Sequence, residues 1–261
     1  KSVSNSGINH PSQIMLYVYL DSFNLKDSVE INLMNSNNEL VTNLSTYHKD
    51  KNYKIELNSG SNLILIPFKL EPAKSVEGMI MWGASLDGPL APPGDYMIIF
   101  KSKKFTDSTK CTIIRDLNYP VDDNDVTRLY NFIKLSRDKV DEAHKTIINI
   151  RDVRRQLFDF STKIENNEQN KPFFKLKTHI DSILSSIENE LYQTKMQSVQ
   201  DPINYPIKLT NKLAHLIALY NGASYPPTNQ AEELGKYLSA LIDAEILRFK
   251  NLQNNELKEI N

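Results

Sequence analysis

Two carboxylates flank the most distinctive loop of the sequence, and a pair of this kind can do acid–base chemistry. Asp87 and Asp95 stand on either side of the run Gly-Pro-Leu-Ala-Pro-Pro-Gly at 88–94. A glycosidase needs two carboxyl groups about 5–10 Å apart across a cleft. Turn carboxylates that bond nearby backbone N–H groups explain the same pair more simply. We therefore predict no catalytic residue in this chain, and Asp87 and Asp95 are the candidates if it is part of a glycoside-acting hydrolase.

Aromatic side chains suggest a second kind of site. Tyr17 and Tyr19 lie two residues apart in an apolar run, and Trp82 is the one tryptophan of the chain. Together they would make a platform for stacking a sugar ring, the candidate site of a carbohydrate-binding sandwich. Aromatic residues in the core of a β-sandwich are the commoner outcome, and this is the interpretation we favour.

Metal and cofactor sites are not indicated. The five histidines are scattered, without the spacing of metal ligands, at His10, His48, His144, His179 and His215. The acidic run at 122–125 is explained by a helix N-terminus, where carboxylates offset the helix dipole, rather than by calcium. No glycine-rich phosphate loop occurs. We predict no metal and no cofactor.

The basic run at 150–157 reads Ile-Arg-Asp-Val-Arg-Arg-Gln-Leu. It resembles an anion site, but Asp152 is mixed into it and it lies on an amphipathic pattern. We interpret it as a solvated helix face with at least one arginine paired to a carboxylate on a neighbouring helix.

Composition limits the function classes. A formal net charge of −1 and a pI near 6.6 argue against nucleic-acid binding, and no run approaches the ~20 apolar residues of a membrane span. The one cysteine, Cys111, lies in the apolar run Cys-Thr-Ile-Ile and is expected to be a buried, unreactive thiol. The chain begins Lys-Ser-Val without a signal sequence, and we interpret it as a piece of a longer protein.

The first half of the chain has the short apolar runs of strands, with no helical period. Eight segments are predicted as strands: Ile14–Leu20, Val29–Leu33, Glu39–Leu44, Tyr53–Leu57, Leu63–Phe68, Met79–Trp82, Tyr96–Phe100 and Lys110–Ile114. Strands at this density indicate an antiparallel sandwich of immunoglobulin-like type over residues 13–118, after a linker at 1–12.

The second half has apolar residues at three- and four-residue steps. One long helix is expected up to Phe158, a second begins at Pro172, a third runs from about Ile207 to Tyr220, and a fourth follows Thr228. Asn221-Gly222 is a typical helix stop. Helices of this kind joined by short loops favour an antiparallel up-down bundle over residues 119–261. The fold class is therefore α+β, as two separate domains.

Three stretches in a fixed order carry a resemblance to a family: the loop at 88–96, the arginine run at 150–157, and Asp201-Pro-Ile-Asn-Tyr-Pro-Ile-Lys-Leu-Thr-Asn-Lys-Leu213, which follows Glu190-Leu-Tyr. The chain resembles the C-terminal region of large secreted bacterial proteins that begin with a β-propeller of sortilin (VPS10) or BNR-repeat type. These proteins are often labelled putative glycosyl hydrolases. The sequence departs from the family at Pro67–Leu70, where a Trp-Asp-x-Arg-like strand end is usual, so no role of that tryptophan or arginine is carried over.

The resemblance implies an FlgD-like immunoglobulin domain, export to the periplasm, cell surface or medium, and an upstream β-propeller in the same parent chain as partner. We therefore expect a non-catalytic accessory module that supports or presents that propeller. The alternatives are the glycoside-acting or carbohydrate-binding sandwich described above, and a helical module that pairs with another protein or with itself.

Overall fold

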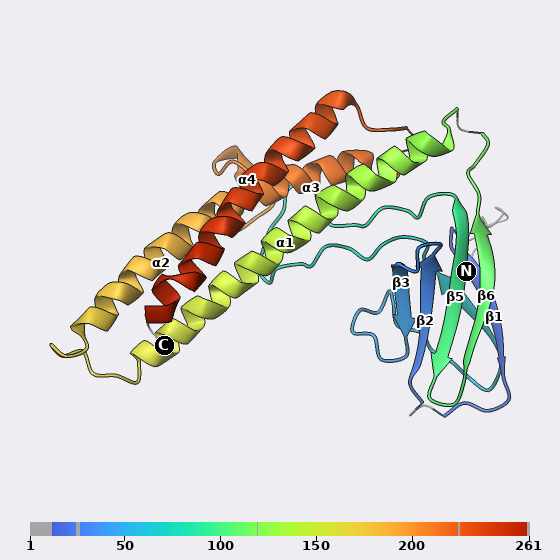
Figure 1. Ribbon diagram of the computed structural model, residues 1–261, viewed down its shortest axis with the longest axis horizontal. Helices are drawn as coiled ribbons and strands as arrows, with labels where there is room; N and C mark the ends of the chain where they lie inside the picture. The colour runs from blue at the N-terminus through green and yellow to red at the C-terminus, as the bar shows by residue number, and fades with distance from the viewer. Residues whose placement is uncertain (1–11, 25–26, 119, 224, 260–261) are drawn as a thin grey trace, which may run out of the picture. The chain divides into compact units, whose positions relative to one another are not determined.

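The structure is a computed structural model that describes residues 12–24, 27–118, 120–223 and 225–259 (Figure 1). It confirms an α+β protein with sheets in the N-terminal part and helices after them. The chain forms two compact units. The sheet unit consists of Lys1–Glu71 and Pro89–Asp123, and the helical unit of Pro72–Gly88 and Asn124–Asn261.

The predicted boundaries, 13–118 and 119–261, therefore need one correction, because residues 72–88 belong to the helical unit. We call these residues the inserted segment. The predicted linker at 1–12 lies outside the described residues except for Ser12, and His10 lies outside them as well.

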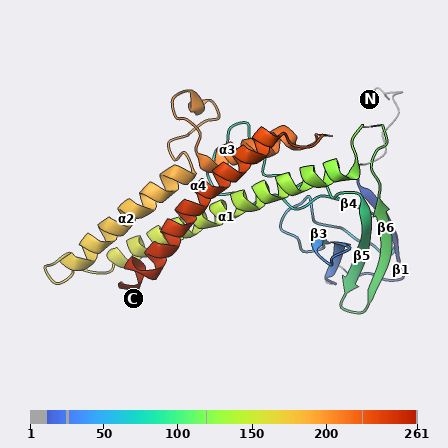
Figure 2. The same ribbon diagram turned by 45° about the horizontal axis from the view of Figure 1, so that its top comes forward.

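Within the described residues the sheet unit has six strands in two antiparallel sheets. Among these strands β1 pairs only with β4, and the larger sheet has the order β3-β2-β5-β6 (Figures 1 and 2). The register aligns Tyr17 with Leu63 in the smaller sheet and Ile31 with Leu44 and Phe100 in the larger. The strands are β1 (Ile14–Leu20), β2 (Val29–Asn35), β3 (Leu40–Ser45), β4 (Gly60–Ile66), β5 (Gly94–Ser102) and β6 (Thr106–Ile113).

Alternation of side chains builds the core of the sheet unit. In β4 and β5 every second residue is buried, as expected for strands with one face on a core: Asn62, Ile64 and Ile66 in β4, and Tyr96, Ile98 and Phe100 in β5. In β1 the alternate residues that share this face, Ile14, Leu16 and Val18, are half-buried and Leu20 is buried. The central strand β2 is buried through Ile31 and Leu33.

Two of the eight predicted strands are wrong. Tyr53–Leu57 forms only an isolated bridge through Lys54 to Ser45, although Tyr53, Ile55 and Leu57 are buried. Met79–Trp82 has no strand pairing and lies in the helical unit. A short apolar run shows that a segment is covered, but not by which element.

The helical unit contains, within the described residues, α1 (Asp123–Ser161), α2 (Lys171–Leu191), α3 (Leu209–Tyr220) and α4 (Asn229–Asn254), with short 3₁₀ turns at Asp201–Ile203 and Glu256–Glu259. The predicted signals set their ends. Pro172 stands in the first turn of α2, Thr228 caps α4 by accepting the N–H of Ala231 at 3.2 Å, and Gly222 takes a positive φ just after α3.

The apolar stripes of the helices face one another and form a continuous core. Ile147, Ile187, Leu213 and Ile242, one from each helix, are completely buried in it. Of the predicted stripe residues, Phe158, Leu234 and Tyr237 are exposed. Over the part of the chain that the structure describes, no helix has the length and apolar character needed to cross a membrane.

The inserted segment leaves the sheet unit between β4 and β5 as a narrow hairpin. The N–H of Leu70 donates to the Pro89 carbonyl and the N–H of Ala91 donates to that of Phe68, at 3.0 and 2.7 Å. Further along, the N–H of Ala73 donates to the carbonyl of Leu86 at 2.7 Å. The chain between these two residues lies along the helices, and its polar anchors form the site described next.

Candidate functional site

Side chains of the helical unit hold the main chain of the inserted segment. Their hydrogen-bond partners are main-chain atoms from Lys74 to Gly83. The anchoring residues are Asp141, His144 and Arg151 on α1, Tyr192 just after α2, and Asn211 and His215 on α3. This arrangement is how a protein binds an extended peptide, and here the peptide belongs to the same chain.

The strongest single anchor is the carboxamide of Asn211, which is buried on α3. Its Oδ1 accepts the N–H of Trp82 at 2.9 Å, and its Nδ2 donates to the Trp82 carbonyl at 2.8 Å. One side chain thereby satisfies both polar groups of one residue, as a neighbouring β-strand would. Without it, Trp82 would lose both of these main-chain hydrogen bonds, each worth about 0.5–1.5 kcal/mol.

His215, one helical turn further along α3, continues the contact. Its Nδ1 lies 2.7 Å from the carbonyl oxygen of Gly83, and its ring stacks on Trp82 with 6.1 Å between centroids and 3° between planes. Gly83 has φ +55°, and a Cβ there would lie 3.2 Å from Nδ1 of His215. Only glycine fits this close approach without strain.

His144 anchors the start of the segment from a completely buried position on α1. Its Nδ1 lies 2.6 Å from the carbonyl oxygen of Lys74, while its Nε2 has no partner among the described residues. Burial lowers the pKa of His144 below 6.5, against the opposing effects of the Lys74 carbonyl and the Asp141 carboxylate. The imidazole is therefore neutral at pH 7, with its proton on Nδ1.

Asp141 binds the N–H of the same residue, Lys74, at 2.7 Å. Its pKa is lowered, because the hydrogen bonds from Lys145 and from the Lys74 N–H outweigh the opposing effect of burial. The main chain of Lys74 is thus held through both its N–H and its carbonyl, by a carboxylate and an imidazole three residues apart on α1.

Apolar side chains of the segment complete the contact. Ala73 and Val76 are buried within the core of the helical unit, and Met79, Met81, Ala84 and Leu86 pack against it. The segment therefore contributes both main-chain hydrogen bonds and apolar surface to this unit.

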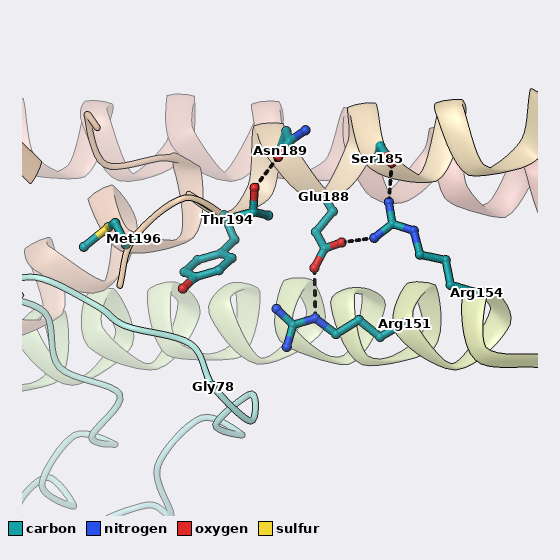
Figure 3. Close-up of a pocket in the computed structure, with 9 residues that line it drawn as sticks. Gly78, Arg151, Arg154, Ser185, Glu188, Asn189, Thr194 and Met196 are labelled. Carbon is teal, nitrogen blue, oxygen red and sulfur yellow. Dashed lines mark hydrogen bonds and ion pairs between the residues drawn. The ribbon is translucent and has the colours of Figure 1, made fainter. Parts of the chain in front are cut away.

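A cluster of charges lies beside the segment, between α1 and α2 (Figure 3). Glu188 is buried and receives Arg151 on one carboxylate oxygen, at 2.9 Å, and Arg154 on the other. Arg154 also binds Ser185 at 2.6 Å and Asp181 at 3.0 Å, and Arg151 donates to the Glu77 carbonyl at 2.7 Å. The prediction that an arginine of this run pairs with a neighbouring helix is confirmed for two of them.

A polar pocket of about 290 Å³ opens at this cluster. Its walls include Arg151, Arg154 and Glu188 together with Asn189, Tyr192 and Thr194. The two guanidinium charges are balanced by the carboxylates of Glu188 and Asp181, so the pocket offers no net positive charge to an anion. Its chemistry is that of a structural ion-pair network, which fixes α1, α2 and the inserted segment to one another.

The two candidate catalytic carboxylates fall in different units. Asp87 belongs to the inserted segment, and its Oδ2 accepts Nδ2 of Asn221 at 3.1 Å. Asp95 lies on β5, where its Oδ1 accepts the hydroxyl of Thr112 at 2.7 Å. Each is bound by a side chain of its own unit, so neither unit by itself contains the carboxylate pair that a glycosidase needs.

The predicted aromatic platform is divided in the same way. Tyr17 and Tyr19 are 71% and 70% exposed on one face of β1, whereas Trp82 is held by α3 in the helical unit. The prediction that these aromatics fill the core of a sandwich is wrong for all three. In β1 the alternation turns both tyrosines outward, because Leu16, Val18 and Leu20 take the inner face.

Cys111 is half-buried on the exposed strand β6, so the prediction of a buried thiol is only partly right. Burial, with the nearby charge of Asp95, raises its pKa, which keeps the thiol protonated and unreactive at pH 7. In the described residues, no group of three or more His, Cys, Asp or Glu side chains is arranged to hold a metal ion.

Sequence reasoning missed Asn211, Tyr192 and Glu188, and it assigned His144 no role as an anchor. A signal was present for Asn211, which falls on the buried stripe of α3 beside Leu213 and Ala214. A polar residue at a core position is more informative than an apolar one, because it must find a partner.

Comparisons with known proteins add no relative. The chain matches no family model, no curated protein and no solved structure.

Proposed function

We propose that this chain is a non-catalytic accessory module of a larger exported β-propeller protein, in which it supports or presents the propeller. The observation that carries the proposal is that the polar side chains of the helical unit bind groups of the chain itself. His144, Asn211 and His215 bind main-chain atoms of the chain's own inserted segment, and Arg151 and Arg154 bind Glu188. Groups that an enzyme would direct at a substrate are here committed to internal contacts.

The strand order supports an immunoglobulin-like identity for the sheet unit. In that fold strands B and E pair in one sheet, and strands C′, C, F and G follow one another in the second. The observed pairs β1-β4 and β3-β2-β5-β6 match this order if β1 is strand B. Tyr96, near the start of β5, donates its hydroxyl to the carbonyl of Pro92 at 2.6 Å. This resembles the tyrosine corner at the start of strand F.

The helical unit fits an accessory role better than a helical docking role. The seams of all four helices are buried in a single core, and among the predicted stripe residues only Phe158, Leu234 and Tyr237 are exposed. A helix that docks on another protein would expose most of its apolar stripe to solvent in the absence of that protein.

The upstream propeller and the export rest on the resemblance of three sequence stretches. Two of these have structural roles that suit a fixed scaffold: the loop at 88–96 leads into β5 and contains the Tyr96–Pro92 hydrogen bond, and the arginine run supplies the partners of Glu188. The reading frame upstream of this chain tests the proposal directly. BNR or Asp-box repeats there support it, and a different enzyme domain contradicts it.

The enzyme alternative has its own test. The purified chain is incubated with chromogenic glycosides and with a fluorogenic peptide library, beside the variants Asp87→Asn and Asp95→Asn. We expect no turnover from any of the three proteins. Turnover by the natural chain that either substitution abolishes would overturn the proposal.

A further inference from the structure

The smaller sheet presents an apolar face to solvent. Met15, Tyr17 and Tyr19 of β1 and Leu63 and Leu65 of β4 all point to the side away from the buried residues of these strands, and all five are exposed. The residues that share this face include no charged group, because neither Ile14–Leu20 nor Ser61–Ile66 contains one. We call these five side chains, with Ser61 beside them, the outer face.

Contiguous apolar surface of this kind marks an interaction site in soluble proteins. The two tyrosines, which are 71% and 70% exposed, offer roughly 300 Å² between them. With the three aliphatic side chains, the outer face comes to about 500 Å². Covering one such face on each of two molecules would bury about 1,000 Å², the size of a weak, reversible interface.

Bulk is distributed unevenly over the outer face. The large side chains Met15, Tyr17 and Tyr19 form a row on β1. The pairing places Leu65, Leu63 and Ser61 directly beside them, in that order, on β4. Leu63 and Ser61 are much smaller than the tyrosines that they face, whereas Leu65 and Met15 are similar in size, so β1 stands higher than β4 at the two tyrosines.

We propose that the outer face binds the outer face of a second copy of this chain. A two-fold axis parallel to the strands, lying between the two sheets, places β1 of each copy over β4 of the other. Tyr17 of one copy then covers Leu63 of its partner, Tyr19 covers Ser61 and Met15 covers Leu65. The two tyrosines of β1 in each copy pack over the smaller side chains of β4 in the other. The same surface is used by both copies, as a closed dimer requires.

A carbohydrate is the competing occupant, since Tyr17 and Tyr19 are the aromatics of the candidate sugar platform. Sugar sites combine aromatic rings with several polar groups that bind the hydroxyls. Here the neighbours of the two rings are Met15, Leu63 and Leu65, and Ser61 supplies the only side-chain hydroxyl of this face besides those of the tyrosines. A second apolar face matches this surface better.

The test is sedimentation equilibrium of the full chain between about 1 and 300 μM, with the variants Tyr17→Glu and Leu63→Lys. The natural chain is expected to pass from its monomer mass of 29.9 kDa toward twice that mass, with a dissociation constant in the micromolar range. Either substitution alone should weaken association by about 100-fold or more, because each dimer would bury two unpaired charges.

An equimolar mixture of the two variants tests the facing arrangement itself. In a mixed dimer the glutamate introduced at position 17 of one copy would cover the lysine introduced at position 63 of the other, and the second contact would remain Tyr17 over Leu63. Association should return in the mixture although neither variant associates alone. Tyr237→Glu is the matched control, because Tyr237 is similarly exposed but lies on α4, and this variant should dimerise like the natural chain.

Three results would overturn the proposal: a natural chain that stays monomeric at 300 μM, single variants that still dimerise, or a mixture that does not associate. The substituted side chains are exposed, so the variants are expected to fold, and far-UV circular dichroism checks this. The measurement on the natural chain decides the main point even if a variant is unstable.

Discussion

The two units bury polar groups in different ways. In the sheet unit the partners are close in the sequence: Asn62 binds the carbonyls of Asn58 and Gly60, and Asn43 donates to Asn32 on the adjacent strand. In the helical unit the partners are far apart, since Asn211 binds Trp82 and His144 binds Lys74. The buried amides of the sheet unit are thus bound by residues near them in the sequence, whereas the buried Asn211 and His144 of the helical unit bind a segment that lies much earlier in the chain.

This difference shows what the inserted segment does. Helices satisfy their own backbone, so a helical core needs no polar side chains to form. The buried Asn211, His144 and Glu188 therefore have a purpose only when the segment or a neighbouring helix binds them. Both units are discontinuous in the sequence, but in the helical unit the earlier piece is held by polar side chains of the later piece.

Replacing the inserted segment should have the largest effect. A variant in which residues 72–88 become a Gly/Ser linker of equal length would remove the buried side chains of Ala73 and Val76, and its flexible main chain would bind Asn211 and His144 only at a large cost in conformational entropy. We expect the helical unit to lose its cooperative thermal transition, while the strands of the sheet unit stay protected from hydrogen exchange. The matched control replaces the loop at 162–170 in the same way, and should keep the transition. A helical unit that melts as before in the first variant would contradict the comparison.

Asn211→Ala tests one of the side chains that hold that segment. The variant removes both hydrogen bonds to Trp82, and we expect a loss of about 1–3 kcal/mol in the free energy of unfolding, because two hydrogen bonds of a buried amide are lost together. Asn43→Ala removes an amide of the same kind from the sheet unit, where the loss should be about 1 kcal/mol. Urea titration monitored by circular dichroism measures both. Equal losses would show that the two units do not differ in this respect.

Glu188→Ala tests the charge cluster. Both arginines would keep their charges without the buried carboxylate. Since Arg151 and Arg154 side chains are 37% and 27% exposed, water can solvate them in part. We expect about 2–3 kcal/mol of destabilisation, below the ~3–5 kcal/mol of a fully buried pair.

Glu190, two residues away and 53% exposed, pairs with Lys208 at 3.4 Å. Glu190→Ala should cost no more than about 0.5 kcal/mol, and a comparable cost for both substitutions would refute a structural role for the cluster.

The smallest effect concerns pH and His144. Because the folded protein holds the pKa of His144 below 6.5, the unfolded chain binds more protons between that lowered value and about 6.5. The free energy of unfolding should therefore fall as the pH falls through this window, by at most about 1.4 kcal/mol per pH unit. His144→Gln should remove this slope, whereas the substitution of the exposed His179 by Gln should leave it. Urea midpoints at pH 7.5, 6.5 and 5.5 measure the slope, and a slope unchanged in His144→Gln would exclude this residue as its source.

Much of the fold could be predicted because its signals are local. Pro172, Thr228 and Gly222 act through their own backbone and hydrogen bonds, so they mark helix ends wherever the helices pack. The alternation in Ile14–Leu20 likewise fixes which residues share a face of the strand.

The assignment of Met79–Trp82 failed because nothing local decides it. Four consecutive apolar residues need a cover, and both the strands and the helices offer one. The choice depends on Asn211, a residue far along the chain whose carboxamide matches an extended main chain. The same limit applies to the charge cluster, where the arginines were recognised from their run but Glu188 had no feature that distinguished it from other helix glutamates.

The discontinuity of the helical unit also sets an order of events during synthesis. The inserted segment leaves the ribosome before any of the helices that bind it, and its last anchor, Asn221, follows Gly88 by about 130 residues. At ~5–20 residues per second, the segment waits on the order of ten seconds before its binding surface is complete. During that interval β4 can pair with β1 and β5 with β2, because these pairings and the hydrogen bond from Leu70 to Pro89 involve no helix. The apolar run from Met79 to Trp82 has no helix to cover it meanwhile. The translation rate over α1 to α3 therefore sets how long this run is exposed on the nascent chain.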